Sequence, residues 1–175
     1  GDDPMIQDLF SLKGRTAIIT GASTGIGAAL AVAFSREGAN LTLAARRLDR
    51  LKEVAQKCPG EVLPLTADVT RDTDRRRIIQ RTLERWGRID ILVNNAGLGI
   101  YGDFLSAAEE DWRQIFEVNL FALVFMTRAV LPHMQSQESG IIVNLASIGG
   151  LIAHSDKVTP YVASKHAVVG FSRGL

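Results

Sequence analysis

The sequence is poor in cysteine and carries almost no net charge. Cys58 is the only cysteine among the 175 residues, so no disulfide can form within the chain. The 20 lysines and arginines balance the 19 aspartates and glutamates to a formal net charge of +1. Such a chain offers no strong electrostatic field for nucleic acid or for a membrane surface. We therefore expect a cytoplasmic protein with neither of these partners.

Long apolar runs and metal-ligand patterns are also missing. The longest apolar run, from Leu120 to Met126, is far shorter than the ~20 residues that a membrane helix needs. The first residues, Gly1 to Pro4, are acidic and polar, unlike a signal peptide. His133, His154 and His166 lack the spacing of metal ligands. These absences predict no membrane span, no signal peptide and no metal site.

Short apolar runs alternate with helical stretches along the chain. The runs that predict strands lie at residues 15–20, 41–45, 62–66, 89–93 and 141–145. This alternation is typical of an α/β fold, in which helices cover both faces of a parallel sheet. With 46% hydrophobic content, the chain can bury one core, so we expect residues 1–175 to form a single domain.

A glycine-rich turn follows the first predicted strand. Residues 20–27 read Thr-Gly-Ala-Ser-Thr-Gly-Ile-Gly, and a helix is predicted to follow, with Ile26 on its apolar side. Gly21, Gly25 and Gly27 allow a tight turn, a close approach of backbone to pyrophosphate, and close packing of helix on sheet. Free N–H groups in the first turn of the helix would point at the phosphates. The context predicts a dinucleotide site, although three glycines alone would also fit a plain turn.

A tyrosine and a lysine stand four residues apart near the end of the sequence. On a helix, Tyr161 and Lys165 would share one face, where the ammonium favours the ionised form of the phenol. A phenol so placed can exchange a proton with a carbonyl oxygen near neutral pH. The pair alone would also fit an ordinary surface helix.

Together these motifs resemble the short-chain dehydrogenase/reductase family. The resemblance is carried by Thr-Gly-x-x-x-Gly-x-Gly at 20–27, Asp68-Val69, Asn94-Asn95-Ala96-Gly97, Asn119, Ser147 and Tyr161-x-x-x-Lys165. It implies a Rossmann-like, doubly wound parallel sheet and an oxidoreductase that interconverts a ketone or aldehyde and an alcohol by hydride transfer. Members of the family continue well beyond the Tyr-x-x-x-Lys helix, so we expect this chain to be C-terminally incomplete and to lack the family's last strands.

The resemblance also implies roles for single residues. Tyr161 would be the catalytic acid/base, Ser147 would hold and polarise the substrate carbonyl, and Lys165 would bind the nicotinamide ribose. Asn119 would hold a water that links Lys165 to solvent. The implied cofactor-binding residues are Gly21, Ser23, Thr24, Gly25, Ile26, Gly27, Arg46, Arg47, Asp68, Val69, Asn95, Ala96, Gly97, Tyr161 and Lys165. For the asparagine pair at 94–95, simple turn formation is the alternative.

The end of the second predicted strand bears on which dinucleotide is bound. NAD sites usually carry an acidic residue there, which accepts hydrogen bonds from the ribose hydroxyls. This chain has Ala44-Ala45-Arg46-Arg47 instead. Arg46 and Arg47 could bind a 2'-phosphate in a fork of hydrogen bonds, so we expect NADP(H) in preference to NAD(H). Thr24 stands where many NADP-using relatives have a second basic residue, and solvated loop charges are the alternative for the two arginines.

Two helices bear on partners. The helix predicted after residue 71 carries an arginine stripe opposite its apolar side, made of Arg77, Arg81, Arg85 and Arg88. A solvated face explains this stripe better than an RNA-binding patch does. Apolar side chains circle the helix predicted from Trp112 to Val130, for which Ser106 and Glu109 fit a capping box. The resemblance implies a homodimer or homotetramer built on this helix, and burial beneath a loop is the alternative.

Two other functions stay open at this point. Extended relatives of the family carry out epimerisation or dehydration with the same cofactor, although the compact length and Asn119 argue against that reaction. A regulator could bind the dinucleotide without turnover. The small-molecule substrate, the direction of the reaction and its stereochemistry are not specified by the sequence.

Overall fold

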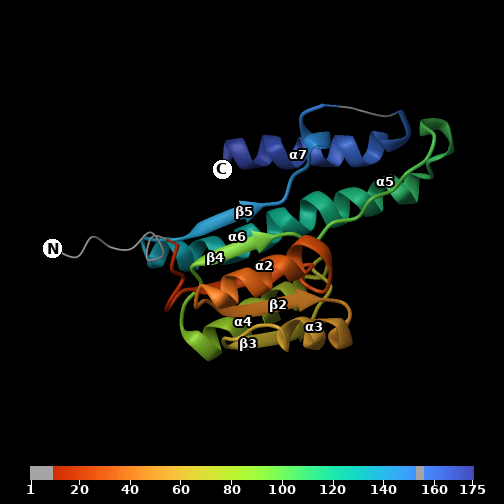
Figure 1. Ribbon diagram of the computed structural model, residues 1–175. Helices are drawn as coiled ribbons and strands as arrows, with labels where there is room; N and C mark the ends of the chain where they lie inside the picture. Colours follow the sequence, from red (N-terminus) through yellow and green to blue (C-terminus); the bar gives the residue numbers. More distant parts are fainter. Residues whose placement is uncertain (1–9, 153–155) are drawn as a thin grey trace.

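The computed structural model describes residues 10–152 and 156–175, which form a parallel sheet with helices on both faces (Figure 1). Gly1–Pro4 and His154 lie outside the described residues. The strands are β1 (Thr16–Thr20), β2 (Asn40–Ala45), β3 (Val62–Thr66), β4 (Ile91–Asn94) and β5 (Ile141–Asn144). Their order across the sheet is β3-β2-β1-β4-β5. The winding therefore reverses between β1 and β4, and the predicted doubly wound, Rossmann-like sheet is confirmed.

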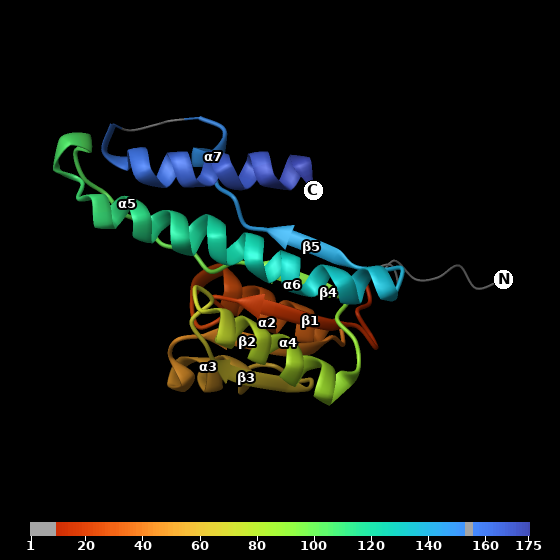
Figure 2. The same cartoon turned by 180° about the vertical axis from the view of Figure 1, so that it is seen from behind.

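The helices form one layer on each face of the sheet. Figure 1 shows α2 (Gly25–Arg36) and α3 (Leu48–Ala55) in front of the strands. Figure 2 shows the opposite face, which is covered by α4 (Asp72–Trp86) and α6 (Ala122–Ser136). α5 (Glu109–Phe116) and α7 (Thr159–Gly174) pack against each other, and α7 runs alongside the edge strand β5 (Figure 1). Short 3₁₀ turns span Phe104–Ser106, Ile148–Gly150 and Asp156–Val158.

Alternation along β1 divides the core between the two faces. Ala17 and Ile19 belong to a cluster with residues of α2 and α3, whereas Ile18 belongs to a cluster with residues of α4 and α6. All five residues of β1 are buried, because the strand lies at the centre of the sheet with helices on both sides. A continuous apolar run is what such a strand requires.

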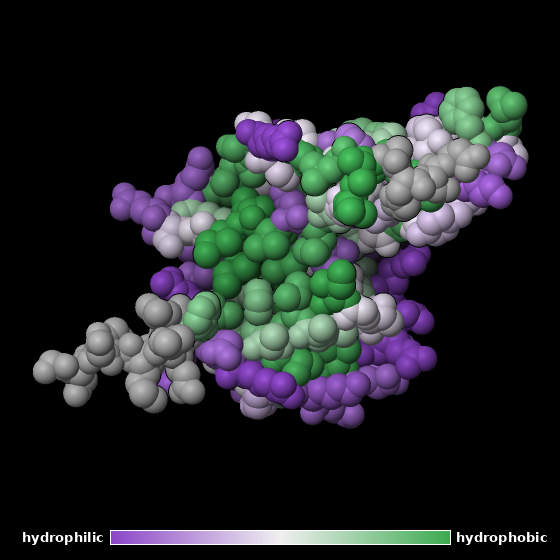
Figure 3. Space-filling view, turned by 45° about the horizontal axis from the view of Figure 1, so that its top comes forward, coloured by the Kyte–Doolittle hydropathy of each residue, from purple (hydrophilic) through white to green (hydrophobic). Residues whose placement is uncertain are grey.

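The edge strand β5 is less covered than β1. Ile142 packs into the cluster beneath α4 and α6, while Ile141 and Val143 point to the other face and are exposed. Figure 3 shows hydrophobic side chains gathered in the middle of that face.

α2 differs in part from the prediction, which placed Ile26, Leu30, Ala33 and Phe34 on its apolar side: Leu30 and Phe34 pack against the core, but Ile26 and Ala33 are exposed. Ile26 was expected on the apolar side, but its side chain is 61% exposed. Gly27, Ala31 and Ser35 face the sheet instead, because the helix lies so close to the strands that only small residues fit beneath it. Leu30 packs at the margin of this contact.

The predicted capping box is wrong. α5 begins at Glu109 after Ala108, and no side-chain hydrogen bond caps it. Ser106 lies in the preceding 3₁₀ turn, where its hydroxyl donates to the Asp103 carbonyl oxygen at 2.9 Å. A capping box would need Ser106 at the N-cap position, but Ala108 occupies it, so Ser106 lies two residues too early to cap the helix.

α5 and α6 are joined through a wide π turn, Glu117–Phe121, into one helical run of 28 residues from Glu109 to Ser136. By length and composition alone this run could span a membrane, which the short apolar stretch in the sequence did not indicate. Buried core helices pass the same test, and Met126 and Val130 of this run are buried beside the sheet. The π turn matters for the site because it carries Asn119.

The arginine stripe of α4 is a solvated face, as predicted. Arg77 pairs with Asp74, Arg81 with Glu84, and Arg85 with Glu61 across to the start of β3. Arg88 lies just beyond the end of α4 and pairs with Asp90.

Arg75 in the same helix was not anticipated as a buried cation. Its side chain donates to the Val69 carbonyl oxygen at 2.8 Å and lies over the Phe125 ring at 5.2 Å from the centroid. It therefore ties the loop after β3 to α6.

Candidate active site

The glycine-rich turn is locked to the turn that follows β4. The Asn95 side-chain amide donates to the carbonyl oxygens of Thr20 at 3.1 Å and of Gly21 at 2.9 Å. The Thr20 hydroxyl oxygen accepts from the backbone N–H groups of Asn95 and Ala96, both at 3.1 Å. A Cβ on Gly21 would lie 2.8 Å from Ala96 Cα, and one on Gly27 would lie 2.5 Å from the Gly21 carbonyl oxygen. Only glycine leaves room for two turns packed this closely.

The start of α2 offers unpaired N–H groups. Thr24 precedes the helix without a side-chain cap, and the first turn contains no acidic residue. The first N–H groups of any helix have no partner within the helix and carry the positive end of its dipole. This end of α2 therefore has the donor set that suits a phosphate group.

A cleft of about 820 Å³ opens at this edge of the sheet, beyond the carboxyl ends of β1 to β4. Its walls include eleven of the predicted cofactor-binding residues: Gly21, Ser23, Thr24, Ile26, Arg46, Arg47, Asp68, Val69, Asn95, Ala96 and Gly97. Gly25 and Gly27 lie in the turn beneath these walls, and Tyr161 and Lys165 do not line the cleft itself. The volume falls in the range of small-molecule and cofactor sites.

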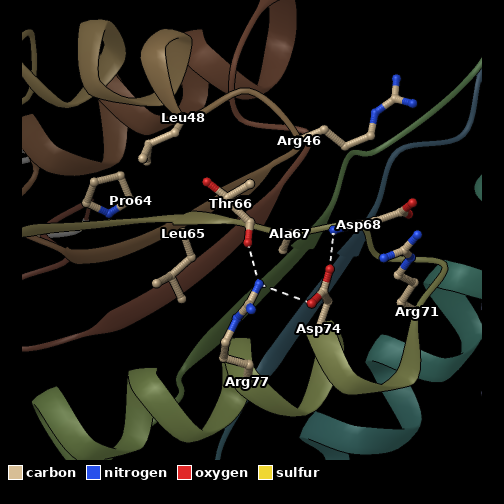
Figure 4. A pocket seen from close by; sticks show the side chains of 10 residues that line it. All are labelled: Arg46, Leu48, Pro64, Leu65, Thr66, Ala67, Asp68, Arg71, Asp74 and Arg77. Carbon is tan, nitrogen blue, oxygen red and sulfur yellow. Dashed lines mark hydrogen bonds and ion pairs between the residues drawn. The ribbon is translucent and has the colours of Figure 1, made fainter.

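One end of the cleft is positively charged. Arg46 and Arg47 are exposed, and among the described residues neither has a carboxylate within ion-pair distance. Figure 4 shows Arg46 reaching out from the end of β2, with the Arg71 guanidinium beside Asp68 in an adjoining groove of about 640 Å³. An anion at this end would therefore meet arginines that are free to bind it.

Asp68 is held in its charged form. Its Oδ1 accepts from the Thr70 N–H at 3.0 Å and from the Thr70 hydroxyl at 2.7 Å. Burial works to raise the pKa of Asp68, but these hydrogen bonds and the charges of Arg71 and Arg46 outweigh it and lower that pKa below its ordinary value. One carboxylate oxygen remains available to a ligand in the cleft.

Ser147 and Tyr161 lie on either side of one glycine. Ser147 precedes the 3₁₀ turn after β5, and its hydroxyl oxygen accepts from the Gly149 N–H at 3.1 Å. A Cβ on Gly149 would lie 3.5 Å from Ser147 Oγ and 3.4 Å from Cε1 of the Tyr161 ring. The turn rests directly on α7, since a Cβ on Gly150 would lie 2.8 Å from the Lys165 carbonyl oxygen.

Lys165 is a buried cation beside this pair. Its ammonium donates to the Leu145 carbonyl oxygen at 2.8 Å and lies 5.8 Å from the centroid of the Tyr161 ring. Burial lowers the pKa of Lys165 from its ordinary value. A Cβ on Gly97 would lie 3.8 Å from Nζ, so the ammonium also adjoins the turn that lines the cleft.

Asn119 lies on the other side of the same turn. Its Oδ1 accepts from the Leu98 N–H at 2.7 Å, and its amide donates to the Leu98 carbonyl oxygen at 2.9 Å and to Ser164 Oγ at 3.0 Å. A Cβ on Gly97 would lie 3.6 Å from Oδ1. Asn119 and Lys165 therefore adjoin Gly97 at the wall of the cleft, while Ser147 and Tyr161 adjoin Gly149 in the loop after β5.

Comparison with known proteins identifies the family. The family model described as short chain dehydrogenase matches residues 15–175. The chain belongs to the short-chain dehydrogenase family. Relatives of this family member include the 3-oxoacyl-[acyl-carrier-protein] reductase FabG of Thermotoga maritima, 36% identical over 93% of this chain and 67% of that protein. The oxidoreductase UcpA of Salmonella typhimurium is 39% identical over 94% of this chain and 63% of that protein.

Solved structures of short-chain dehydrogenases share the fold. A short-chain type dehydrogenase/reductase from Mycobacterium marinum superposes with a TM-score of 0.91 at 35% identity, over 95% of this chain and 68% of that one. A short chain dehydrogenase/reductase from Burkholderia phymatum, solved in complex with NAD, gives 0.90 at 32% identity over 94% and 60%. This dehydrogenase chain thus spans roughly two thirds of the length of its relatives.

Several wall residues of this short-chain dehydrogenase were not predicted from sequence. They are Ala44, Ala45, Ala67, Thr70, Leu98, Gln114, Glu117 and Val118. Gln114, Glu117 and Val118 stand three and four residues apart, which places them on one side of a helix. That spacing was a usable signal, but the apolar residues around the same helix obscured it.

Proposed function

We propose that this chain is the dinucleotide-binding and catalytic domain, over residues 1–175, of an NADP(H)-dependent oxidoreductase that interconverts a ketone or aldehyde and an alcohol. One observation carries the proposal. The Lys165 ammonium adjoins Gly97 at the wall of a cleft that also carries arginines without ion-pair partners. The Tyr161 ring lies 5.8 Å from that ammonium and shares Gly149 as a neighbour with the Ser147 hydroxyl. A proton donor, a cation and a dinucleotide-sized cleft in one place suit carbonyl reduction.

The donor set of the cleft fits a dinucleotide phosphate. The uncapped start of α2, with Gly25 in its turn, would hold the pyrophosphate, and Arg46 and Arg47 would hold a 2'-phosphate. Asp68 and Val69 would lie against the adenine, and the turn from Asn95 to Gly97 would contact the ribose. When bound, NADP(H) would supply or accept the hydride at the carbonyl carbon.

The protein's own residues would manage the oxygen of the substrate. Because Ser147 Oγ already accepts from the Gly149 N–H, its own proton is free to be donated to the carbonyl oxygen. Tyr161 would donate its phenolic proton to that oxygen during reduction, and accept one during oxidation. Both hydrogen bonds stabilise the charge that develops on the oxygen.

Lys165 and Asn119 would support the phenol. The Lys165 ammonium donates one N–H to the Leu145 carbonyl oxygen, which leaves two N–H donors for the nicotinamide ribose and for the ionised phenol. Asn119 Oδ1 keeps one lone pair after accepting from Leu98, and a water held there would relay protons to solvent.

The proposal is tested by mixing the purified protein with NADPH and a panel of ketones and aldehydes. Steady loss of NADPH absorbance is expected with at least one carbonyl compound. Tight NADPH binding without oxidation of the cofactor by any compound would contradict the proposal and favour a regulator without turnover. Conversion of a substrate without net use of cofactor would point to an epimerase or dehydratase.

We also propose a cytoplasmic homodimer or homotetramer that acts on a small-molecule carbonyl or alcohol and binds neither nucleic acid nor a membrane. Phe121 and Phe125 support the assembly, because they are 43% and 38% exposed on one side of the long helix and stack on each other at 6.2 Å. A second copy of the chain would cover them.

A further inference from the structure

A buried serine stands between the tyrosine and the lysine of α7. Ser164 is fully buried, and its hydroxyl makes two hydrogen bonds. It donates to the Tyr161 carbonyl oxygen at 2.7 Å and accepts from the Asn119 side-chain amide at 3.0 Å. The hydroxyl therefore joins α7 to the π turn of the long helix.

The chemistry of these groups fixes the direction of each bond. A carbonyl oxygen only accepts, so the single Ser164 proton is committed to Tyr161. Only a lone pair then faces Asn119, and Asn119 must present its NH₂ group. Its Oδ1 is thereby turned toward the Leu98 N–H, which it accepts at 2.7 Å. Reversing the amide would place Oδ1 against two acceptors, Ser164 Oγ and the Leu98 carbonyl oxygen, and the NH₂ group against the Leu98 N–H, which is a donor.

The same chain of hydrogen bonds extends to the wall of the cleft. Asn119 holds both the N–H and the carbonyl oxygen of Leu98, and Leu98 lines the cleft. The neighbouring Gly97 lies between Asn119 Oδ1 and Lys165 Nζ. The Ser164 hydroxyl thus adds a third bond that favours the same orientation of the amide as the two Leu98 bonds do, and it ties the loop on which substrate and cofactor would rest to α7.

We propose that Ser164 is a positioning residue of the carbonyl-reducing site. It holds the Asn119 amide in one orientation and fixes the 97–98 loop against α7, without touching the reacting atoms. The role rests on the function proposed above.

The chain offers a matched control. Ser172, two turns later in α7, donates to the Val168 carbonyl oxygen at 2.8 Å and accepts from the Asn144 side-chain amide at 2.9 Å. Ser164→Ala and Ser172→Ala each remove one hydroxyl bonded to a helix carbonyl and an asparagine. They differ in burial, because Ser172 is exposed and Ser164 is not, and only Ser164 is bonded to Asn119.

Two measurements on both variants test the proposal. Ser164→Ala should lower kcat about 10- to 100-fold with the KM for the carbonyl substrate within about threefold, as expected when reacting groups are slightly misplaced. Hydrogen exchange of the Leu98 amide should quicken about tenfold or more. Ser172→Ala should change neither quantity, and Ser164→Thr, which keeps the hydroxyl, should restore both.

Equal changes in kcat and in Leu98 exchange for Ser164→Ala and Ser172→Ala would overturn the role of Ser164. So would slow Leu98 exchange in Ser164→Ala. If the unsubstituted protein binds NADPH but reduces no carbonyl compound, two claims are contradicted: the proposed function and the expected effect of Ser164 on kcat. The exchange comparison would still decide separately whether Ser164 positions the loop.

Discussion

Arg46 differs from most arginines of this chain in having no carboxylate partner among the described residues. On α4 and around Asp90, arginines are paired with nearby acids and their charge is already used. At the mouth of the cleft, neither Arg46 nor Arg47 makes an ion pair with a described residue, although the charge of Arg46 helps to lower the pKa of Asp68. An arginine without an ion-pair partner in the protein is available to bind a ligand phosphate.

Arg46→Asp should therefore weaken NADPH binding more than NADH binding. Loss of hydrogen bonds to a charged phosphate, at about 1.5–3 kcal/mol, corresponds to roughly 10- to 100-fold in the Kd for NADPH. Fluorescence titration with both cofactors measures the ratio. Arg50→Asp makes the same charge change on α3, where Arg50 pairs with Glu53, and serves as the control. An unchanged preference in Arg46→Asp would move the 2'-phosphate contact elsewhere.

Asp90 is the residue on which acid stability should depend. It is buried, and it accepts from the Thr16 N–H at 2.8 Å and from Arg88 Nε at 2.7 Å, with Arg15 nearby. Burial works to raise the pKa of Asp90, but these partners outweigh it and lower that pKa. The carboxylate thus stabilises the fold above its unfolded pKa of about 3.9, and this contribution is lost as the pH falls through the lower folded value.

Asp90→Asn should reduce the free energy of unfolding at neutral pH by about 2 kcal/mol, because a buried charge-assisted network is broken while its arginines can turn to solvent. The variant should also lose part of the fall in stability below about pH 4. Urea unfolding at several pH values measures both effects. Asp49→Asn, at an exposed site of α3, is the control. A parallel pH dependence in Asp90→Asn and the unsubstituted protein would contradict this account.

At the scale of elements, the strands and most helices were predictable and the entry to the long helix was not. Each predicted strand overlaps an observed one, because alternation between apolar strand and helix is strong in this chain. Both α5 and the π turn that carries Asn119 contact α7. These are tertiary contacts between segments distant in sequence, which a local sequence pattern does not reveal. The small residues beneath α2 show the same limit, since tight packing overrode the apolar pattern that included Ile26.

The packing of α2 makes a prediction of its own. Gly27→Ala should destabilise the protein by about 1–3 kcal/mol, because the added methyl group would overlap the Gly21 carbonyl oxygen and force the turn to shift. NADPH binding should weaken with it. Thermal unfolding and cofactor titration measure these effects. Gly170→Ala in α7 is the control, since nothing lies within 4 Å of its added Cβ and helix propensity should raise stability by about 0.5–1 kcal/mol. Tolerance of both changes would refute the tight contact.

Most of the site could be predicted because its residues follow strands whose carboxyl ends meet at one edge. The supporting residues could not. Ser164 and Arg75 act through contacts with elements distant in sequence, and no local pattern marks a buried hydroxyl or a buried arginine as different from an exposed one. Their positions emerge only when α6 and α7 pack.

At the scale of the whole molecule, the exposed aromatic face of the long helix predicts self-association. Phe121→Asp should shift the mass of the particle toward the monomer, since a charge would be buried at the contact between copies. Sedimentation velocity measures the change. Phe10→Asp alters another exposed phenylalanine, 67% exposed and outside this helix, and should leave the mass unchanged. A monomeric unsubstituted protein, or equal shifts in both variants, would rule out this face as the contact.

The proposed function joins a charged dinucleotide cleft to a tyrosine that donates a proton, and Tyr161→Phe separates these two parts most directly. The substitution removes only the phenolic oxygen and its proton, so NADPH titration should give a Kd within about threefold of the original. The rate of carbonyl-dependent NADPH oxidation should fall by about 10²- to 10⁴-fold, the usual contribution of a general acid. Turnover by Tyr161→Phe at a rate close to that of the unsubstituted protein would contradict the account.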